Sequence, residues 1–513
     1  MSETLWTLAA FVVYLLVMII IGFVYFKKTK NSEDFFLGGR SLNSWTAALS
    51  AQASDMSGWL LMGLPGAIYV AGTGEIWIAI GLLIGTILNW FLVASRLRKY
   101  TIKAGNSLTL PSFFENRFRD RTKILKIISA VFITVFFLVY TASAFTAGAK
   151  LFENVFGINY TVALAIGAFV ILIYTFFGGF KAVCVTDFIQ GLLMLAALMV
   201  VPIVAFFLIG GADGVSSGLA AHGVESVSGF LNPMLTSKGE PMSAVSIISN
   251  LGWALGYFGM PHILVRFMAV RSTGEIKKSR IIAIVWVTIS LSAACFVGVI
   301  GKAYLGGILP DGQSENVFIK MIMEIFNNEW SLPFVGGLLL CGILAAVMST
   351  ADSQLLVTSS SVSEDLYRGV INRKASDKNA LLVSRITVVA VAVIAFFIAL
   401  DPESSVMGLV SNAWAGFGAA FGPVILLSLF WKRSNLPGAA AGMILGGGTV
   451  LAWDYLPIVN GHTLGEATGL YSLVAGFALA LAGMIAVSLL TKRPSQEIID
   501  EFEYVKTTKE LDG

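Results

Sequence analysis

Cysteine and histidine are scarce in this sequence, with three of each among 513 residues. The cysteines lie far apart inside apolar segments, which indicates neither a disulfide framework nor a metal site of the CxxC type. We interpret them as small core residues: Cys184, Cys295 and Cys341. The histidines also lack metal-ligand spacing, and we assign no role to any of the three: His222, His262 and His462.

Charged residues are scarce too, at 13% of the chain, whereas hydrophobic residues make up 56% and mean hydropathy is +0.81. These values place most of the length in lipid rather than in one water-soluble core. The sequence therefore predicts an all-α polytopic membrane protein. Its net charge of +3 indicates no nucleic-acid partner, because Lys and Arg cluster between apolar runs, where membrane topology requires them.

The first apolar run, 6–26, has Glu3 before it and lysines after it, the reverse of a secretory signal peptide. We expect a retained helix with its N-terminus outside. Further runs bring the expected number of membrane helices to about thirteen. These runs are 44–70, 72–95, 124–148, 160–177, 184–209, 243–266, 281–303, 332–360, 383–400, 406–429, 437–456 and 467–490.

The positive charges alternate between the two sides of these runs. If the chain begins outside, all but four of its 34 Lys and Arg residues fall on the cytoplasmic side, where such residues are enriched. We therefore expect the C-terminus inside. The exceptions are Lys150, Lys238, Lys302 and Lys320. The inside loop 96–126 contains a candidate interfacial segment at 110–114, and the outside loops 210–242 and 304–331 have room for short lid helices.

An interrupted stretch lies inside the apolar run 44–70. Asp55 stands among Ser, Gly and Trp in 53–59 (ASDMSGW), and Gly63, Pro65 and Gly66 follow. From Ser44 it lies about 17 Å along a helix, near the middle of a ~30 Å hydrocarbon core. An ionisable residue at that depth indicates a functional site. Broken backbone there exposes carbonyl groups that are good ligands for small ions.

A second interrupted stretch, 252–261 (GWALGYFGMP), lies in the run 243–266. The two runs cross in opposite directions, and interrupted helices at matching positions indicate the inverted repeats of secondary transporters. We expect repeats at 44–209 and 243–429, separated by the outside loop 210–242. The remaining segments are a peripheral helix with its loop at 1–43, peripheral helices at 430–490, and a cytoplasmic tail at 491–513.

Five motifs in this order resemble the sodium:solute symporter family, and within it the bacterial symporters of proline. They are 35–40 (FFLGGR), 54–59 (SDMSGW), 256–262 (GYFGMPH), 348–354 (MSTADSQ) and 432–439 (KRSNLPGA). The resemblance covers nearly the whole chain. It implies a five-plus-five inverted-repeat fold like that of LeuT, and alternating access driven by a Na⁺ gradient.

Ala346, Ser349 and Thr350 share one helix face, since they are three and four residues apart. Spacing alone favours small residues that ease helix packing. The resemblance implies instead that they bind Na⁺ through the Ala346 carbonyl and the two hydroxyls, together with the carbonyls of Ala53 and Met56. Such oxygens suit a hard cation.

Asp55 has three open roles: a direct Na⁺ ligand, an electrostatic attractor of the ion, or a cap of the broken half-helix. We favour a role in Na⁺ binding. For a zwitterionic substrate, the N–H groups around Ser57 and Gly58 suit the carboxylate, and carbonyls freed in the second break suit the amine. The resemblance places aromatic residues around proline: Tyr140, Trp253 and Tyr257, with Trp59 and Pro261 as weaker candidates.

Other charges lie near the expected helix ends, where snorkelling or loop pairing explains most of them: Arg40, Glu75, Asp187 and Asp352. A gate or ion-entry role is a further hypothesis for Arg40 and Asp187.

The resemblance implies Na⁺-coupled uptake of L-proline across a bacterial cell membrane, with no obligate protein partner. Alternatives are the same fold carrying a sugar, a vitamin carboxylate or another small solute, and a membrane sensor that does not concentrate its ligand. The tail after Leu490 is short for a signalling domain. An enzyme is the least favoured class, because no nucleophile elbow, metal cluster or phosphate loop is present.

Overall fold

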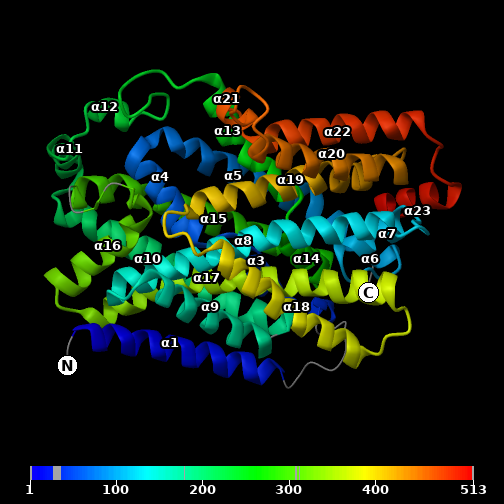
Figure 1. Ribbon diagram of the computed structural model, residues 1–513, viewed down its shortest axis with the longest axis horizontal. Coiled ribbons are helices and arrows are strands. Elements are labelled where there is room, and N and C mark those ends of the chain that lie inside the picture. Colours follow the sequence, from blue (N-terminus) through cyan, green and yellow to red (C-terminus); the bar gives the residue numbers. More distant parts are fainter. Residues whose placement is uncertain (1–2, 27–35, 178, 307–308, 311, 511–513) are drawn as a thin grey trace.

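The computed structural model describes residues 3–26, 36–177, 179–306, 309–310 and 312–510. This part of the chain is a bundle of helices (Figure 1). Its extended pairing is confined to isolated bridges such as Leu42 with Val270. Phe35, the first residue of the motif 35–40, lies outside the described residues.

Every stretch expected to cross the membrane is helical. Ten helices of the described part are long and apolar enough to cross one. They are α1 (Glu3–Phe26), the continuous segment Thr73–Lys103 that contains α5 (Ile76–Leu88) and α6 (Ala94–Lys103), α8 (Ile124–Phe156), α10 (Phe180–Leu208), α15 (Thr273–Leu305), α17 (Pro333–Ser360) with its extension to Ile371, α18 (Asp377–Ile398), α19 (Val406–Phe430), α20 (Leu436–Tyr455) and α22 (Ser472–Leu490). A shorter helix, α9 (Tyr160–Phe177), follows α8.

The two remaining stretches are interrupted, as expected. The first consists of α3 (Ser44–Asp55), the π-helical turn η2 (Trp59–Gly63) and α4 (Leu64–Ala71). The second consists of α13 (Ala244–Gly252), the 3₁₀ segment η5 (Trp253–Phe258) and α14 (Pro261–Ala269). Several helices are longer than the apolar runs that predicted them. For example, α15 begins eight residues before its expected start, because Ser272 caps it by accepting a hydrogen bond from the Glu275 N–H.

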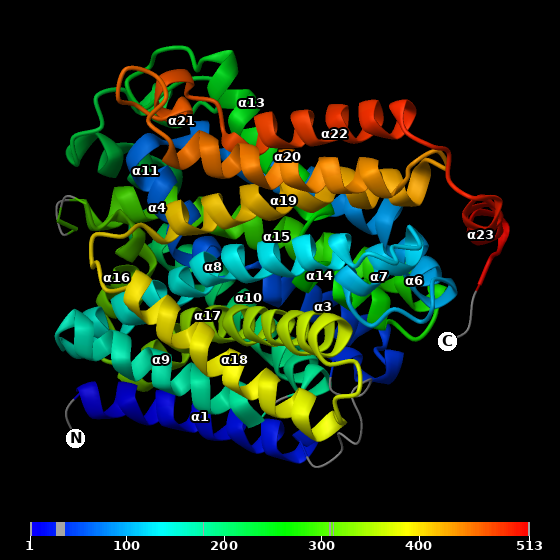
Figure 2. The same ribbon diagram turned by 45° about the vertical axis from the view of Figure 1, so that its right-hand side comes forward.

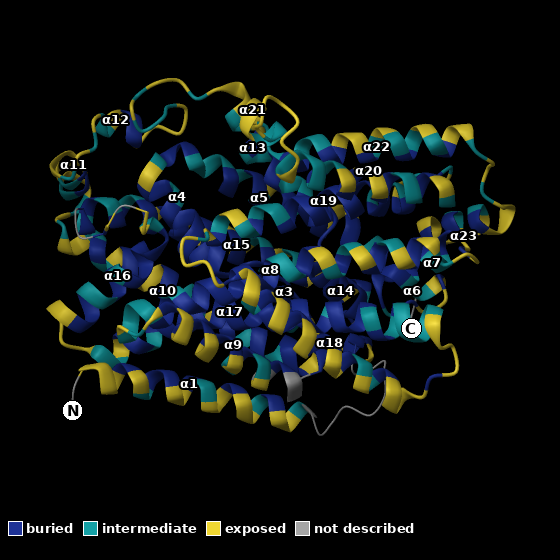
Figure 3. Cartoon of the chain, in the orientation of Figure 1, coloured by how far each residue is buried: buried dark blue, intermediate teal, exposed yellow. Residues whose placement is uncertain are grey.

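The centre of the bundle is formed by α17 and α19, each with 83% of its most apolar window buried, against 33% for α1, α18 and α22. Figure 3 shows the same gradient from buried centre to exposed rim. In both views α1 lies on one side of the bundle and α20 with α22 on the other (Figure 1, Figure 2). The helices that contact α3 are α10, α14, α15 and α17.

The loops contain short helices. The loop 210–242 holds α11 (Gly211–Ala221) and α12 (Val227–Phe230), and 304–331 holds α16 (Val317–Ile322) and η7 (Met323–Glu329). In the tail, α23 (Gln496–Thr507) contacts α6.

The interpretation of 110–114 as an interfacial segment was wrong. This segment begins α7 (Leu110–Arg117), which buries Phe113 and Phe114 completely. Their rings pack against Tyr100 (5.6 Å) and Phe421 (6.0 Å), so α7 belongs to the protein core.

Candidate functional site

The break after α3 is a sharp turn at Met56. Its φ of −79° and ψ of 73° form an inverse γ-turn, in which the Ser57 N–H donates to the carbonyl of Asp55 (2.9 Å). In a continuing helix that N–H would donate to Ala53 instead. The turn therefore frees the Ala53 carbonyl. The Met56 N–H still donates to Gln52 (2.8 Å), so the helix ends at this residue.

The freed carbonyl meets the polar face of α17. The Ser349 hydroxyl donates to the carbonyl of Ala53 (2.8 Å) and lies 3.2 Å from that of Ala346. Beside it, the Thr350 hydroxyl is buried and has no hydrogen-bond partner in the described part of the chain. All of the expected Na⁺ ligands are fully buried: Ala53, Asp55, Met56, Ala346, Ser349 and Thr350. A freed carbonyl beside an unpartnered hydroxyl suits a small hard cation.

Asp55 connects the two interrupted stretches. Its Oδ2 accepts a hydrogen bond from the Tyr257 hydroxyl (2.6 Å), whereas Oδ1 is buried without a partner among the described residues. The Asp55 backbone carbonyl accepts from the indole of Trp59 (3.0 Å) and the hydroxyl of Tyr140 (3.4 Å). The side chain bonds to Tyr257 rather than to the half-helix, which does not support the capping alternative.

The second break follows from Pro261, the first residue of α14. Proline has no N–H to donate, so the carbonyl of Tyr257 loses its helical partner. The Asn89 side chain donates to that carbonyl instead (3.0 Å). Pro261 itself lines a small cavity with Phe180 and Asp365. None of the aromatic residues expected around proline lines that cavity.

Aromatic rings surround the breaks. The centroids of Trp59 and Trp253 are 6.4 Å apart. Two further rings, Trp414 and Tyr471, were missed from the sequence: they stack on Trp253 at 6.2 and 5.4 Å. The Trp414 indole also donates to the Trp253 carbonyl (2.9 Å). The signal available for Trp414 was the glycine-rich sequence around it, AWAGFG. Its indole packs where Gly256 has no side chain.

Gly58 explains how the second half-helix fits. A Cβ atom at this position would stand 2.7 Å from the Cβ of Ala147 in α8, closer than carbon atoms approach. The half-helix begins here, so its first N–H groups lack helical partners. The Ser57 hydroxyl accepts from one of them, the Trp59 N–H (3.4 Å). The positive dipole of this helix end suits an anionic group.

Asp187 lies deeper than the sequence analysis expected. It is fully buried in α10 and forms an ion pair with Arg266 of α14 (3.1 Å), so pairing in a loop was the wrong interpretation. Ser50 of α3 donates to the same carboxylate oxygen (2.7 Å), and Arg266 donates to Ser353 of α17 (2.5 Å). Asp352, also expected near a helix end, is fully buried beside this network. Arg266 was missed because it was placed at the end of an apolar run.

Arg40 lies between the start of the first interrupted stretch and the end of the second. Its guanidinium donates to the carbonyls of Met268 (2.6 Å) and Ser107 (3.0 Å). Arg98 donates to the carbonyl of Val270 (2.6 Å), which is bridged to Leu42. Arg40 thus joins the chain before α3 to the end of α14.

At the opposite end, Glu315 caps α19. Its carboxylate accepts from the N–H groups of Val406 and Met407 (both 3.0 Å) and from the ammonium of Lys150 in α8 (2.7 Å). Burial alone would raise the pKa of Glu315, but Lys150 and the two N–H groups bring it below its ordinary value. This carboxylate joins a loop to two membrane helices.

Known proteins share this sequence and architecture. The sodium:solute symporter family matches residues 35–446. The high-affinity proline transporter PutP of Bacillus subtilis is 47% identical over 494 residues, 96% of this chain and 99% of the relative. The sodium/proline symporter of Escherichia coli is 46% identical over 501 residues, 96% of this chain and 95% of the relative.

A solved structure shares the fold. The substrate-bound outward-open state of a Na⁺-coupled sialic acid symporter has a TM-score of 0.78 at 20% sequence identity, covering 96% of this chain and 99% of that one. With the sequence matches spanning nearly the full length, the chain belongs to the sodium:solute symporter family.

Proposed function

We propose that this protein carries L-proline into the cell together with Na⁺ by alternating access. The observation that carries the proposal is the contact of Ser349 with the carbonyl freed at the break, 2.8 Å from Ala53. It joins the face of α17 that carries Ala346, Ser349 and Thr350 to the turn that would present the substrate groups. Relatives at 46–47% identity bear the names of proline transporters.

The proposed topology has thirteen membrane crossings, with the N-terminus outside and the C-terminus inside a bacterial cell membrane. The alternation of Lys and Arg supports it. The two chain ends lie toward opposite ends of the long axis (Figure 1). This placement supports an odd number of crossings, which leaves the two ends on opposite sides of a membrane. The inverted repeats would comprise 44–209 and 243–429, with 1–43 and 430–490 around them.

The Na⁺ ligands in this proposal are the carbonyls of Ala53, Met56 and Ala346 and the hydroxyls of Ser349 and Thr350. The Ser349 proton would turn away from Ala53 as the ion enters, so that both oxygens face it. All five ligands are neutral, which keeps affinity modest enough for release. Asp55 lies within one helical turn of Ala53 and Met56 in the chain. Its carboxylate supplies the negative charge that attracts the ion.

The two helix breaks provide the backbone groups that would bind the substrate. The N–H groups at Ser57 and Gly58 would bind the carboxylate of proline, with the Ser57 N–H giving up its hydrogen bond to the Asp55 carbonyl. Carbonyls of η5 would bind the amine. The pyrrolidine ring would lie among the rings of Trp59, Tyr140, Trp253 and Tyr257. Each of these residues contacts the break or another of the rings.

The energy of Na⁺ entry is sufficient. One charge crossing 100 mV supplies about 2.3 kcal/mol, and a tenfold Na⁺ gradient adds about 1.4 kcal/mol. With one ion per substrate, the sum supports accumulation of roughly several hundredfold.

The test is radiolabelled L-proline uptake into proteoliposomes, with an inward Na⁺ gradient and with K⁺ in its place. The proposal expects concentrative uptake with Na⁺ only. Excess unlabelled glucose, pantothenate and other amino acids, added separately, report on the alternative cargoes. Uptake that is equal in both salts, or that a different solute abolishes at lower concentration than proline does, would reject proline symport.

A further inference from the structure

A cavity of about 460 Å³ lies directly beside Trp253, on the face proposed as the outer one. Its volume is within the range of small-molecule sites. Its walls come from both interrupted stretches and from the helices at the rim, α20 to α22. The lining residues include Glu75, Asn250, Trp253, Ser411, Asp454 and Tyr471.

Two carboxylates line this cavity without a cationic partner in the described part of the chain. The Oε2 of Glu75 accepts from the Asn250 side chain (3.3 Å). The Oδ2 of Asp454 accepts from Asn412 (2.8 Å) and Ser472 (2.9 Å). In each case the hydrogen bonds engage one oxygen and orient the group. Partly buried carboxylates that lack a counter-charge favour a cation.

The floor of the cavity is aromatic. Trp253 and Tyr471 stack with centroids 5.4 Å apart and planes inclined by 24°. Tyr471 is fixed, since its hydroxyl donates to Ser411 (2.6 Å) and its N–H to Ser249 (3.0 Å). Trp253 is only 5% exposed, and its indole N–H makes no hydrogen bond among the described residues. Below the floor, Trp253 faces Trp59 (6.4 Å).

We propose that this cavity is an entry site that binds zwitterionic proline before it reaches the breaks. Glu75 and Asp454 hold the secondary ammonium over the aromatic floor, and the Trp253 indole donates to the carboxylate. The helices α20 to α22 then form the wall of an entrance rather than only a rim. The inference rests on the proposed function for the identity of the solute.

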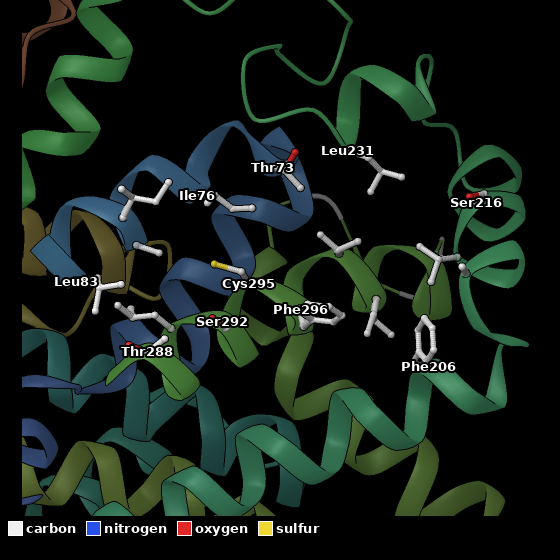
Figure 4. A pocket seen from close by; sticks show the side chains of 17 residues that line it. Thr73, Ile76, Leu83, Phe206, Ser216, Leu231, Thr288, Ser292, Cys295 and Phe296 are labelled. Atoms are coloured by element: carbon white, nitrogen blue, oxygen red, sulfur yellow. The ribbon is translucent and has the colours of Figure 1, made fainter. Parts of the chain in front are cut away.

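A second large cavity does not offer this chemistry. It measures about 500 Å³ and is lined by α5, α10, α11 and α15. Figure 4 shows the apolar side chains of Phe206, Cys295 and Phe296 around it. No charged side chain lines it, so it does not suit a zwitterion.

The first test compares transport with binding. In the variant Glu75→Gln with Asp454→Asn, the amides keep the shape and an acceptor oxygen but lose the charge. We expect the KM for proline uptake to rise about tenfold, with the maximal rate and the equilibrium Kd at saturating Na⁺ within about twofold. The control is Glu225→Gln, an exposed carboxylate of the same outer face, which should change neither. A rise in Kd equal to the rise in KM would show a purely structural effect of the substitutions and would overturn the proposal. A KM equal to that of the wild type would also overturn it.

The second test does not depend on transport. The three native cysteines are buried, so a Ser411→Cys variant offers one reactive thiol in the cavity. A trimethylammonium methanethiosulfonate should label it about tenfold faster than a sulfonate reagent. L-proline should slow the labelling even when K⁺ replaces Na⁺, and both effects should disappear with Glu75→Gln and Asp454→Asn.

These results separate the two proposals. Protection by proline without concentrative uptake would retain the entry site and reject symport. Concentrative uptake with no charge preference in the labelling, or with no Na⁺-independent protection, would reject the entry site and retain symport.

Discussion

The Ser349 hydroxyl and the Ala53 carbonyl are 2.8 Å apart, although 296 positions separate the two residues in the chain. Ala53 belongs to the last turn of α3, and Ser349 lies in the middle of α17. The contact therefore joins the two proposed repeats at the point where the first helix breaks. An ion bound between these oxygens would stabilise the turn at Met56, and with it the N–H groups that face the substrate.

Removing one ligand hydroxyl should weaken Na⁺ binding. For Ser349→Ala we expect the Na⁺ concentration that gives half-maximal uptake to rise about tenfold, since one oxygen contact to the ion is lost. The matched control is Thr358→Ala on the same helix, whose hydroxyl donates only to Gln354 of its own helix (2.8 Å). Equal Na⁺ dependence in the two variants would contradict the assignment of Ser349.

Asp55 and Tyr257 should differ in their effects, although they share a hydrogen bond of 2.6 Å. Asp55→Asn removes the charge that we propose attracts the ion, so Na⁺-stimulated uptake should be lost. Tyr257→Phe removes only the donor, so uptake should persist at an altered Na⁺ half-saturation. Initial uptake rates over a Na⁺ titration give both values. If Asp55→Asn retained a normal titration, the charge would have no part in ion binding.

Breaking the buried pair of Asp187 and Arg266 should destabilise the fold. Both side chains are fully buried, and removal of one partner from such a pair typically costs about 3–5 kcal/mol. Thermal unfolding of purified Asp187→Asn should show this loss. The control is Asp377→Asn, whose partner Arg368 lies 2.9 Å away and whose side chain is 59% exposed. A surface pair of this kind contributes about 0–1 kcal/mol, and equal losses in both variants would contradict the argument.

The close packing of Gly58 can be tested by compensation. Gly58→Ala should lower uptake, because its Cβ would lie 2.7 Å from that of Ala147. Adding Ala147→Gly removes the obstructing atom and should restore much of the activity. At Gly448 a Cβ meets nothing within 4 Å, so Gly448→Ala is the control and should be neutral. Failure of the double variant to recover would show that Gly58 is needed for another reason.

The cap on α19 predicts a pH dependence. The pKa of Glu315 in the fold lies below its ordinary value of 4.5, so its ionised form stabilises the folded state. That contribution is fully present above pH 4.5 and declines as pH falls through the lower, folded value. The Tm difference between the wild type and Glu315→Gln should therefore be constant from about pH 6 to 7.5 and shrink below about pH 4.5. A difference that grew on acidification would contradict this sign.

Local chemistry explains which features could be predicted. The breaks were found because Asp, Gly, Ser and Pro cluster within two apolar runs, around Met56 and before Pro261, whereas the isolated Pro202 and Pro423 lie inside continuous helices. Helical spacing predicted that Ala346, Ser349 and Thr350 share one face of α17, whereas their proposed role as Na⁺ ligands came from the family resemblance. By contrast, the partners of Asp187 and Trp253 depend on which helices meet: Arg266, Trp414 and Tyr471 are distant in sequence. Asp454, which lines the proposed entry site, belongs to a helix that was expected to be peripheral. The segment that begins α7 was misplaced because an apolar segment fits either lipid or core.

Coupling is the central claim, and reciprocity tests it most directly. If Na⁺ stabilises the break that presents the substrate groups, saturating Na⁺ must lower the Kd of proline by the same factor by which saturating proline lowers the Kd of Na⁺. Equilibrium binding of both radiolabelled ligands to the purified protein gives the two factors. We expect equal factors of about tenfold or more in the wild type, and a factor close to one in Ser349→Ala. A proline Kd that is the same with and without Na⁺ in the wild type would contradict the account.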